Sequence, residues 1–404
     1  MGNAPPSLNS QAPPPTPVVQ APTSGSESFP RFRWRRFRRL VLSVLAILLV
    51  ANLFLYATWI AFHPSLGSAA RVVLGIVAVA AGASFVAASL LTWAYFNWAV
   101  RVFYTIAAVW VGLMTFCIFA ACASWIVLGI ARVAGLEIAP NLIADGFFSA
   151  GLLIGIYGVV NAATVRVNRI TVKLPNLPER WRGRVAALVS DLHLGHIRNV
   201  GFMRRIVARL NRLRPDIVFI AGDLYDGTIV DAKAVAQPWS ALSVPLGALY
   251  VTGNHEEFSN RAAYLHAVGS AGVRVLNNEK IEIDGLQIIG IHYGETVDAE
   301  TYRAVLRKAA ISQERASVLI VHAPHRLPIA EEAGISLQVS GHTHGGQFPP
   351  GSWVAKRVYG PFVHGLHRLG KLLVFTNWGA GTWGPPLRVG TNAEIVLITF
   401  EDFL

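Results

Sequence analysis

The stretch Gly341-His342-Thr343-His344-Gly345-Gly346-Gln347 decides how the second half of the chain is interpreted. It follows apolar residues at alternating positions, Ile335, Leu337 and Val339, which are typical of a strand. Both histidines are therefore expected in a turn at the carboxyl end of a strand, where open α/β sheets carry their sites. A glycine-rich turn with two histidines suggests a metal site. Taken alone, it equally fits an ordinary pair of loop histidines, because short motifs match by chance.

The region around this turn, residues 166–404, alternates short β-rich runs with amphipathic segments. This alternation predicts an α/β domain of about 240 residues, which is large enough for its own core. The predicted strands cover residues 185–190, 217–221, 248–252, 287–291, 318–322, 336–340, 372–376 and 395–400. The predicted helices cover residues 202–213, 232–242, 261–268 and 299–310.

Several predicted strands end in side chains that bind metals. Asp191 and His193 are two apart on extended backbone, so they project to the same side and can chelate one ion. A glycine before Asp223, Asn254 and His342 allows a sharp turn and a close backbone approach. The whole set comprises Asp191, His193, Asp223, Asn254, His255, His322, His342 and His344.

Each of these residues alone has an ordinary explanation. Asp223 and Asn254 fit turns, and His322 fits a core histidine. Five strand ends that supply aspartate, asparagine and histidine without cysteine are harder to explain by chance. They predict a site of nitrogen and oxygen ligands suited to Mn, Fe, Zn or Mg.

In their order and spacing, these blocks resemble the signature of the calcineurin-like metallophosphoesterase superfamily: Asp-x-His, Gly-Asp, Gly-Asn-His, a later His and Gly-His-x-His. The continuation Gly345-Gly346-Gln347, residues 222–227 and the tail from Asn377 to Ile395 are similar to one branch. That branch contains membrane-associated bacterial phosphodiesterases and the eukaryotic transmembrane protein with a metallophosphoesterase domain. The resemblance covers roughly residues 180–404 and implies a four-layer αββα sandwich.

The resemblance also implies hydrolysis of a phosphoric ester by a metal-activated hydroxide at two divalent ions, with manganese favoured. One ion would be held by Asp191, His193, Asp223 and His344, and the other by Asp223, Asn254, His322 and His342. His255 would face the phosphate as the general acid instead of binding a metal. Glu256 stands where the family usually has an aspartate that orients this histidine, and its longer side chain is expected to reach the same imidazole.

Further polar residues lie near these motifs. His325 is expected at a helix start or a pocket rim, His292 either lines the pocket or is structural, and Asp226 is expected to support the ligands by hydrogen bonds. The basic segment from Lys356 to Lys371 either holds a phosphate or anionic headgroup or is a solvated loop.

The first half of the chain has a different composition. The chain is 53% hydrophobic and 14% charged, which is too apolar for an ordinary soluble protein. Spans are predicted at residues 40–62, at two places within 72–130 that separate near residues 97–101, and at 144–165. A buried helical core of a soluble protein is the weaker alternative, because uninterrupted apolar runs of this length are rare outside bilayers.

Two stretches rich in proline and in arginine precede the first predicted span. Residues 1–30 contain eight prolines and are predicted to be a disordered tail. Residues 31–39 contain six arginines, which favours contact with anionic lipid. The sequence therefore predicts three regions: the tail 1–30, the basic anchor with about four transmembrane helices 31–165, and the α/β domain 166–404.

The basic residues also predict the orientation in a cell (inner) membrane. With four spans, residues 31–39, Arg101 and residues 166–173 share one side, whereas the other side receives Arg71 and Arg132. The positive-inside rule then places the catalytic domain on the cytoplasmic face, and a different number of spans would reverse this.

The sequence thus predicts a multi-pass, membrane-anchored phosphoesterase acting on a phosphodiester or phosphomonoester. A phospholipid or other lipid-linked substrate is favoured because the site is tethered to the bilayer. The alternative is a metal-binding membrane scaffold without turnover, which typically loses His255 or the bridging aspartate, and both are present. Nucleic acid is not expected as a partner, because the catalytic half lacks basic stripes with stacking aromatics, apart from the loop after Gly351. The oligomeric state stays open.

Overall fold

The computed structural model describes residues 31–258 and 260–402, with side chains of helix α1 from residue 36 onward. The predicted disordered tail, residues 1–30, lies outside the described residues. Residues 44–404 form one compact unit, and the first residues of α1, up to Ser43, belong to another.

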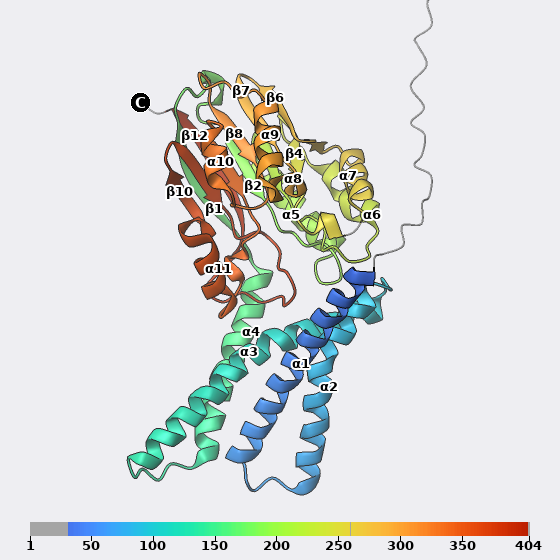
Figure 1. The fold of residues 1–404 in the computed structure, drawn as a ribbon, viewed down its shortest axis with the longest axis vertical. Coiled ribbons are helices and arrows are strands. Elements are labelled where there is room, and N and C mark those ends of the chain that lie inside the picture. The colour runs from blue at the N-terminus through green and yellow to red at the C-terminus, as the bar shows by residue number, and fades with distance from the viewer. Residues whose placement is uncertain (1–30, 259, 403–404) are drawn as a thin grey trace, which may run out of the picture. The chain divides into compact units, whose positions relative to one another are not determined.

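Among the described residues, four helices are long and apolar enough to cross a membrane (Figure 1). They are α1 Arg31–Phe62, α2 Ser68–Thr92, α3 Trp98–Val133 and α4 Pro140–Ala163. The predicted separation near residue 97 is confirmed, because the Asn97 side chain caps α3 by accepting a hydrogen bond from the Val100 N–H. The last helix starts earlier than predicted, since Pro140 suits the first turn of a helix.

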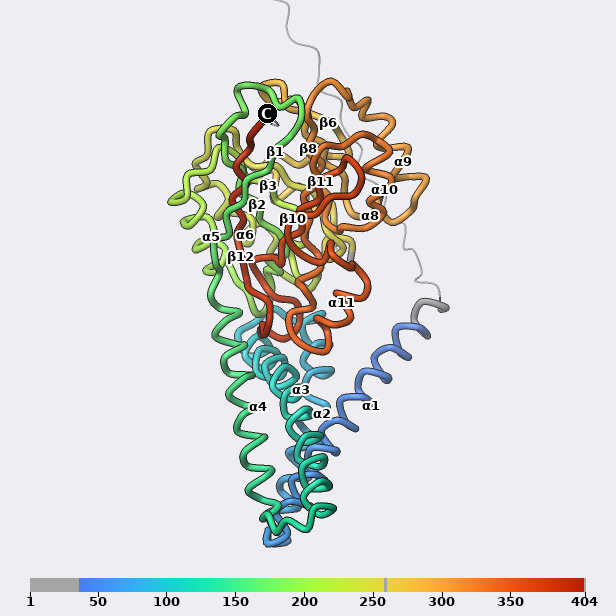
Figure 2. Tube along the Cα trace, turned by 90° about the vertical axis from the view of Figure 1, so that its left-hand side faces the viewer, coloured from blue at the N-terminus to red at the C-terminus, as the bar shows by residue number. Residues whose placement is uncertain are grey.

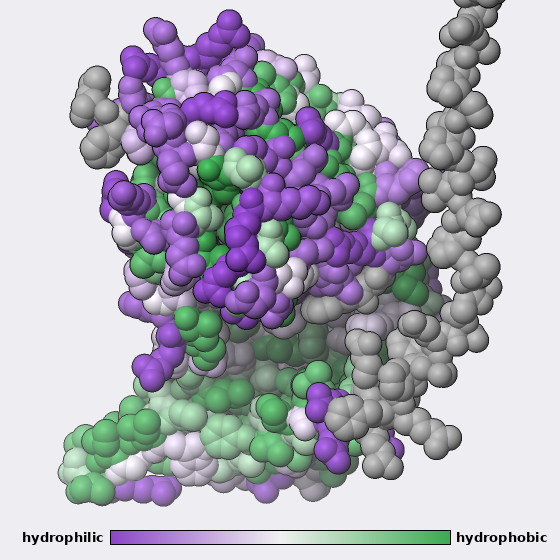
Figure 3. Space-filling view, turned by 45° about the horizontal axis from the view of Figure 1, so that its top comes forward, coloured by the Kyte–Doolittle hydropathy of each residue, from purple (hydrophilic) through white to green (hydrophobic). Residues whose placement is uncertain are grey.

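These helices carry apolar side chains on their outer surfaces. Ile47 of α1, Ile76 of α2 and Ile126 of α3 are all exposed. Hydrophobic residues also gather over the helical region in Figure 3, in contrast to the polar surface of the sheets. Such a surface is poorly solvated by water and well solvated by lipid, and helices satisfy their own backbone hydrogen bonds there.

The described part of the second half forms two sheets. The first has the strand order β1, β12, β2, β3, β4, β5, and the second has the order β10, β11, β9, β8, β7, β6. Strand bounds in the first sheet are β1 Val165–Leu174, β2 Val185–Val189, β3 Ile217–Ala221, β4 Ala248–Val251, β5 Arg274–Val275 and β12 Ala393–Asp402. In the second they are β6 Glu279–Ile283, β7 Leu286–Gly290, β8 Ser317–Ile320, β9 Leu337–Ser340, β10 Gly365–Leu369 and β11 Leu372–Thr376.

The two sheets pack face to face, with helices outside them. Alternate residues of β2 show the arrangement: Ala186 and Leu188 pack in the core between the sheets, whereas Ala187 and Val189 pack against helices. Helices α5 Val200–Leu213, α6 Ala232–Ala236 and α7 Arg261–Ser270 cover the first sheet, and α9 Ala299–Lys308 and α10 Leu327–Glu332 cover the second. The predicted fold class, a four-layer αββα sandwich after a helical membrane region, is confirmed.

Some elements differ from the sequence-based prediction. The predicted helix 232–242 divides into α6 and a 3₁₀ turn, residues 237–241, where Pro238 cannot donate a backbone hydrogen bond. Strand β1 was not predicted because its charged residues hide the alternation, yet it pairs along its full length with β12. The short helices α8 Tyr293–Val297 and α11 Gly351–Tyr359 were also not predicted.

Helix α4 joins the sheets through a single residue, Thr164, and also packs against them (Figure 2). Its partner is the β11–β12 loop, residues 377–392. A Cβ atom added to Gly158 of α4 would lie 2.7 Å from Leu387 and 2.8 Å from Val389. The loop and the helix therefore touch where no larger side chain fits.

We predict that Gly158→Leu destabilises the protein by about 1–3 kcal/mol, the usual effect of overpacking. Gly146→Leu on the same helix is the matched control, because its Cβ would meet no described atom within 4 Å. Both changes raise helix propensity equally, so the comparison isolates the contact. Thermal unfolding of the full chain in one detergent measures the difference, and equal melting temperatures would contradict the packing.

Candidate metal centre

All the candidate ligands of the sequence analysis follow the carboxyl ends of strands. Asp191 and His193 come after β2, Asp223 after β3, Asn254 and His255 after β4, His322 after β8, and His342 and His344 after β9. Strands from both sheets therefore contribute. Because parallel neighbouring strands end at the same edge, these side chains come together, and Asp223, Asn254, His255, His342 and His344 line one pocket.

The side chains form two clusters. In the first, His344 Nε2 lies 3.0 Å from His193 Nε2 and 3.4 Å from Asp191 Oδ1. In the second, His322 Nε2 lies 3.1 Å from Asp223 Oδ2 and 3.0 Å from His342 Nδ1. These groupings have the spacing expected of metal ligands.

Asn254 and Asp223 complete the arrangement. The Asn254 Oδ1 atom lies 3.1 Å from His322 Nε2, within the second cluster. Asp223 Oδ2 is 3.7 Å from His193 Nε2 and 3.1 Å from His322 Nε2. One carboxylate oxygen thus faces both clusters.

The hydrogen bonds of His322 test whether these residues suit a cation. Its Nδ1–H lies 2.8 Å from the Ala221 carbonyl, which can only accept. When the ring is neutral, its Nε2 therefore carries a lone pair, and this atom faces the oxygens of Asp223 and Asn254. Lone pairs that converge in this way repel one another unless a positive charge lies between them, so the residues fit a metal ion.

The electrostatics of the cluster favour a positive charge, either a proton on His322 or a metal ion, at this place. Burial lowers the pKa of His322, but the Asp223 carboxylate outweighs it and raises the pKa to about 9. Burial likewise raises the pKa of Asp223, but the positive charge of His322 outweighs it and lowers the pKa. Burial raises the pKa of Asp191, with a further contribution from Asp223. Two buried carboxylates therefore favour a positive charge in this corner of the site.

The backbone at these positions is also unusual. Asp191, His193, Asp223, His342 and His344 all have positive φ angles, between 46° and 71°. Non-glycine residues rarely adopt this region, and such residues concentrate at functional sites. A Cβ atom on Gly341 would overlap Ser190, which explains the glycine before His342.

His255 lies at the side of the two clusters. Its Nδ1–H donates to the Asp226 carbonyl at 2.9 Å, and its backbone N–H donates to Asp223 Oδ1 at 2.9 Å. Burial, followed by the neighbouring His193, lowers the pKa of His255. The ring lines the pocket, with its centroid 4.6 Å from that of His193.

Glu256 does not have the contact expected from the sequence. Its carboxylate accepts backbone hydrogen bonds from Gly253 at 2.6 Å, Tyr225 at 2.9 Å and Asp223 at 3.0 Å. The expectation that it reaches the His255 imidazole is therefore wrong. The longer side chain points beneath the Asp223 turn and joins the ends of β3 and β4. Burial, and after it the charge of Asp223, raises the pKa of Glu256 to about 7.

Arg388, in the β11–β12 loop, was missed by the sequence analysis because nothing in its neighbourhood distinguishes it from a surface arginine. It is fully buried. Its guanidinium donates to the carbonyls of His344 at 3.1 Å, Trp378 at 2.7 Å and Gly381 at 2.8 Å. Its backbone carbonyl accepts from Asn161 of α4 at 3.0 Å. Arg388 thus connects α4 to the turn that carries His344.

We predict that Arg388→Met destabilises the folded protein by about 2–4 kcal/mol, because it leaves several buried carbonyls without a donor. Arg315→Met is the control, since Arg315 forms a half-exposed ion pair with Glu282 at 2.8 Å and such pairs contribute about 1 kcal/mol or less. Thermal unfolding in detergent is the measurement. Equal melting temperatures for the two variants would contradict this assignment of Arg388.

The clusters form one side of a pocket of about 540 Å³. Its other wall contains Phe348, Tyr359, Trp383 and Pro385, which the sequence analysis did not identify. Gln347 holds this wall: its side-chain amide donates to the Trp383 carbonyl at 2.8 Å and accepts from the Trp383 N–H at 2.9 Å. The pocket thus combines a polar floor with an apolar wall.

Other histidines near the motifs do not join the clusters. His325 Nε2 lies 3.0 Å from the Thr296 carbonyl, just before α10. His292 is buried and accepts a hydrogen bond from the Thr252 N–H at 3.0 Å, so its role is structural. His196 contacts the carbonyl of Tyr95, between α2 and α3, at 3.0 Å.

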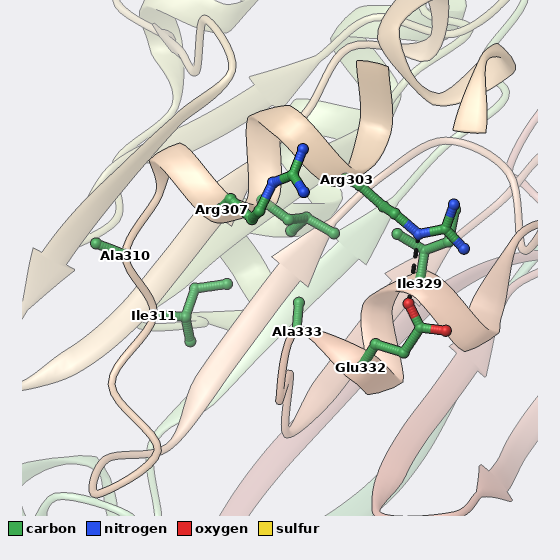
Figure 4. A pocket seen from close by; sticks show the side chains of 8 residues that line it. Arg303, Arg307, Ala310, Ile311, Ile329, Glu332 and Ala333 are labelled. Carbon is green, nitrogen blue, oxygen red and sulfur yellow. Dashed lines mark hydrogen bonds and ion pairs between the residues drawn. The ribbon is translucent and has the colours of Figure 1, made fainter. Parts of the chain in front are cut away.

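A second hollow, of about 390 Å³, lies between α9 and α10 (Figure 4). Its lining is largely apolar, with Ile311 and Ile329 among its residues. The Arg303 guanidinium pairs with Glu332 at 3.4 Å across it. It shares no residue with the pocket at the clusters, and its charged lining residues are Arg303, Arg307 and Glu332.

Two packed sheets with clustered carboxylates and imidazoles at their strand ends are typical of the metallophosphoesterase fold. Residues 185–346 match the calcineurin-like phosphoesterase family, and the chain belongs to this family. Family members depend on a dinuclear metal centre, in agreement with the clusters of aspartate and histidine.

Named relatives extend the similarity beyond the matched domain. An uncharacterized metallophosphoesterase of Campylobacter jejuni is 30% identical over 299 residues, which cover 71% of this chain and 79% of the relative. The transmembrane protein with metallophosphoesterase domain of Danio rerio is 30% identical over 294 residues, 65% of this chain and 65% of that protein. A solved structure, GAP50, the anchor in the inner membrane complex of Plasmodium, aligns with a TM-score of 0.33 at 12% identity, over 53% of this chain and 79% of that one.

Proposed function

We propose that this chain is a membrane-anchored phosphoesterase that hydrolyses a phosphodiester or phosphomonoester with two divalent metal ions. The observation that carries the proposal is that Asp223 Oδ2 faces both clusters of ligand atoms over one pocket. Such a pair of ions, when bound, supplies positive charge for the phosphoryl oxygens and activates water. Asp191, His193, Asp223 and His344 would hold one ion, and Asp223, Asn254, His322 and His342 the other.

The chain's own residues have separable tasks in this proposal. His255 is the general acid for the leaving oxygen, because its Nδ1–H is engaged by Asp226 and its ring lines the pocket. Burial and His193 lower its pKa, whereas the negative charge of a bound substrate would raise it and favour the protonated form that a general acid needs. Glu256 and Arg388 are positioning residues that hold the turns of Asp223 and His344.

The second candidate function, a metal-binding scaffold without turnover, is less well supported. His255 and Asp223 are both present, and the pocket beside them has room for a substrate. Purified full-length protein that binds metal but hydrolyses no phosphoester would favour the scaffold.

Metal removal tests the proposal directly. Treatment with a chelator is expected to lower hydrolysis of an aryl phosphodiester by at least ~10³-fold, because metal ions supply several kcal/mol of charge stabilisation. Adding back Mn, Fe, Zn or Mg separately would identify the active ion, with Mn favoured. Activity that persists in metal-free protein, checked by elemental analysis, would contradict the proposal.

The substrate and the orientation are part of the same proposal. A lipid-linked phosphoester is favoured because residues 166–404 are joined to membrane-length helices, and the domain is proposed to lie on the cytoplasmic face of the inner membrane. Protease added to sealed right-side-out vesicles should leave the C-terminal half intact. Digestion of that half would contradict the orientation without affecting the chemistry.

A further inference from the structure

Helix α11 carries large apolar side chains on its outer surface. Trp353, Val354 and Val358 are 62%, 61% and 66% exposed, whereas Ala355 is buried against the domain. Val354 and Val358 are four residues apart, so they form one strip along the helix. An exposed strip of this kind on a polar domain indicates a contact surface.

The strip is continuous with the membrane-length helices. The Trp353 ring lies 6.1 Å from that of Phe119 in α3. Phe348, which precedes α11 and lines the pocket, lies 6.1 Å from Phe116 of the same helix. Figures 1 and 2 both show α11 on the side of the sheets that faces α3 and α4. The exposed strip and the pocket wall thus adjoin one apolar helix.

The length of α3 indicates where this contact lies in a bilayer. Its 36 residues span about 54 Å at 1.5 Å per residue, more than the ~30 Å of hydrocarbon. Arg132 lies in the last turn of α3, and about 20 helical residues cross one hydrocarbon thickness. The other surface of the hydrocarbon layer is therefore expected about 20 residues earlier, near Gly112. The β11–β12 loop packs there, with Leu387 3.0 Å from the Cβ position of Gly112. Phe116 and Phe119 lie on the hydrocarbon side of that level.

We infer that α11 lies in the surface layer of the bilayer and that lipid occupies its exposed strip. Acyl chains pack against Trp353, Val354 and Val358. Lys356 and Arg357, which are exposed on the same helix, face anionic headgroups. This assigns Lys356 and Arg357, the first two residues of the basic segment, to lipid headgroups.

The same arrangement specifies the substrate class. Phe348 precedes α11 and Tyr359 is its last residue, and both line the pocket of the metal clusters. A phosphoester carried by a membrane lipid therefore enters the pocket beside α11 while its acyl chains stay in the leaflet. The substrate assignment rests on the proposed phosphoesterase function, whereas the lipid contact of α11 does not.

The lipid contact is tested on the full chain in vesicles of phosphatidylcholine with about one-third phosphatidylglycerol, an anionic lipid. In a Cys117→Ala, Cys122→Ala background, a spin label is attached after Val354→Cys or Val358→Cys. The matched control is Val297→Cys on α8, which is similarly exposed, at 51%. Labels on α11 should collide with dissolved oxygen more than with a water-soluble nickel chelate, and the control label should show the reverse.

Two results would overturn the contact. Nickel access equal to that of the control would place α11 in water. Protection from both oxygen and nickel would mean that protein, a second copy or another partner, covers the strip. In the labelled variants, replacing Lys356 and Arg357 by glutamine should reduce the depth of the label in the anionic vesicles but not in vesicles of phosphatidylcholine alone.

The substrate class is tested by turnover of two substrates in the same vesicles. The ratio of lipid phosphoester to soluble aryl phosphodiester hydrolysis should fall about tenfold in Trp353→Ser/Val354→Ser/Val358→Ser and not in Val297→Ser. An unchanged ratio would overturn entry beside α11. If no phosphoester is hydrolysed while the labels face lipid, the proposed function fails and the lipid contact stands. If the labels face water while the aryl ester is hydrolysed, the lipid contact alone fails.

Discussion

Replacing Asp223 by asparagine is expected to lower hydrolysis of an aryl phosphodiester by at least ~10³-fold. The change keeps the size of the side chain but removes the charge that faces both clusters, at 3.7 Å from His193 Nε2 and 3.1 Å from His322 Nε2. Loss of one bridged ion removes several kcal/mol of charge stabilisation, and about 1.4 kcal/mol corresponds to a factor of ten.

The matched control for this variant is Asp231→Asn. Asp231 is an exposed residue that caps α6 through hydrogen bonds at 3.1 Å, and asparagine caps helices equally well. Metal content by elemental analysis and the rate are measured together. A normal rate for Asp223→Asn with two bound ions would mean that the assignment of the bridging ligand is wrong.

Replacing His255 by alanine is expected to keep both ions and to lower turnover by about 10²- to 10⁴-fold, the usual contribution of a general acid. The loss should depend on the leaving group. An alkyl ester, whose alkoxide needs a proton, should show the full effect, whereas a dinitrophenyl ester, whose phenolate leaves unprotonated, should show little. A structural or metal-binding role would slow both substrates equally.

His266→Ala on α7 is the control, because His266 is an exposed histidine in contact with Ser270 at 3.3 Å. A His255→Ala variant that loses metal but retains part of its rate would move this residue among the metal ligands. Equal losses with both esters at full metal content would remove its role as the general acid.

Much of the fold was predictable because the sequence patterns that indicate strands and helices involve residues close together in the chain. The strands 217–221 and 372–376 were predicted with their observed bounds, since short apolar runs between turns are typical of buried strands. Strand β1 escaped prediction because only its pairing with β12 explains an extended segment with so many charged residues. Helix α11 was not predicted because its apolar residues face outward, against the usual pattern of a surface helix.

Only part of the candidate site was predictable from the sequence. The eight residues named from sequence follow strand ends, where the topology of an α/β sheet brings side chains together. Their supporting residues were not predictable, because those contacts cross long stretches of chain: Arg388 lies 44 residues from His344, and Glu256 lies 33 from Asp223. The Glu256 carboxylate was assigned to the wrong partner because residue spacing does not specify side-chain direction.

The amino-acid sequence by itself determined the kinds of ligand, their place at strand ends and the membrane-length helices, because periodicity and composition depend on neighbours in the chain. Only the tertiary structure decided which residues hold those ligands in place and where the pocket lies relative to α3, α4 and α11. Arg388 illustrates the difference: one buried guanidinium connects a membrane-length helix to the His344 turn, and only the packing of distant segments creates that contact.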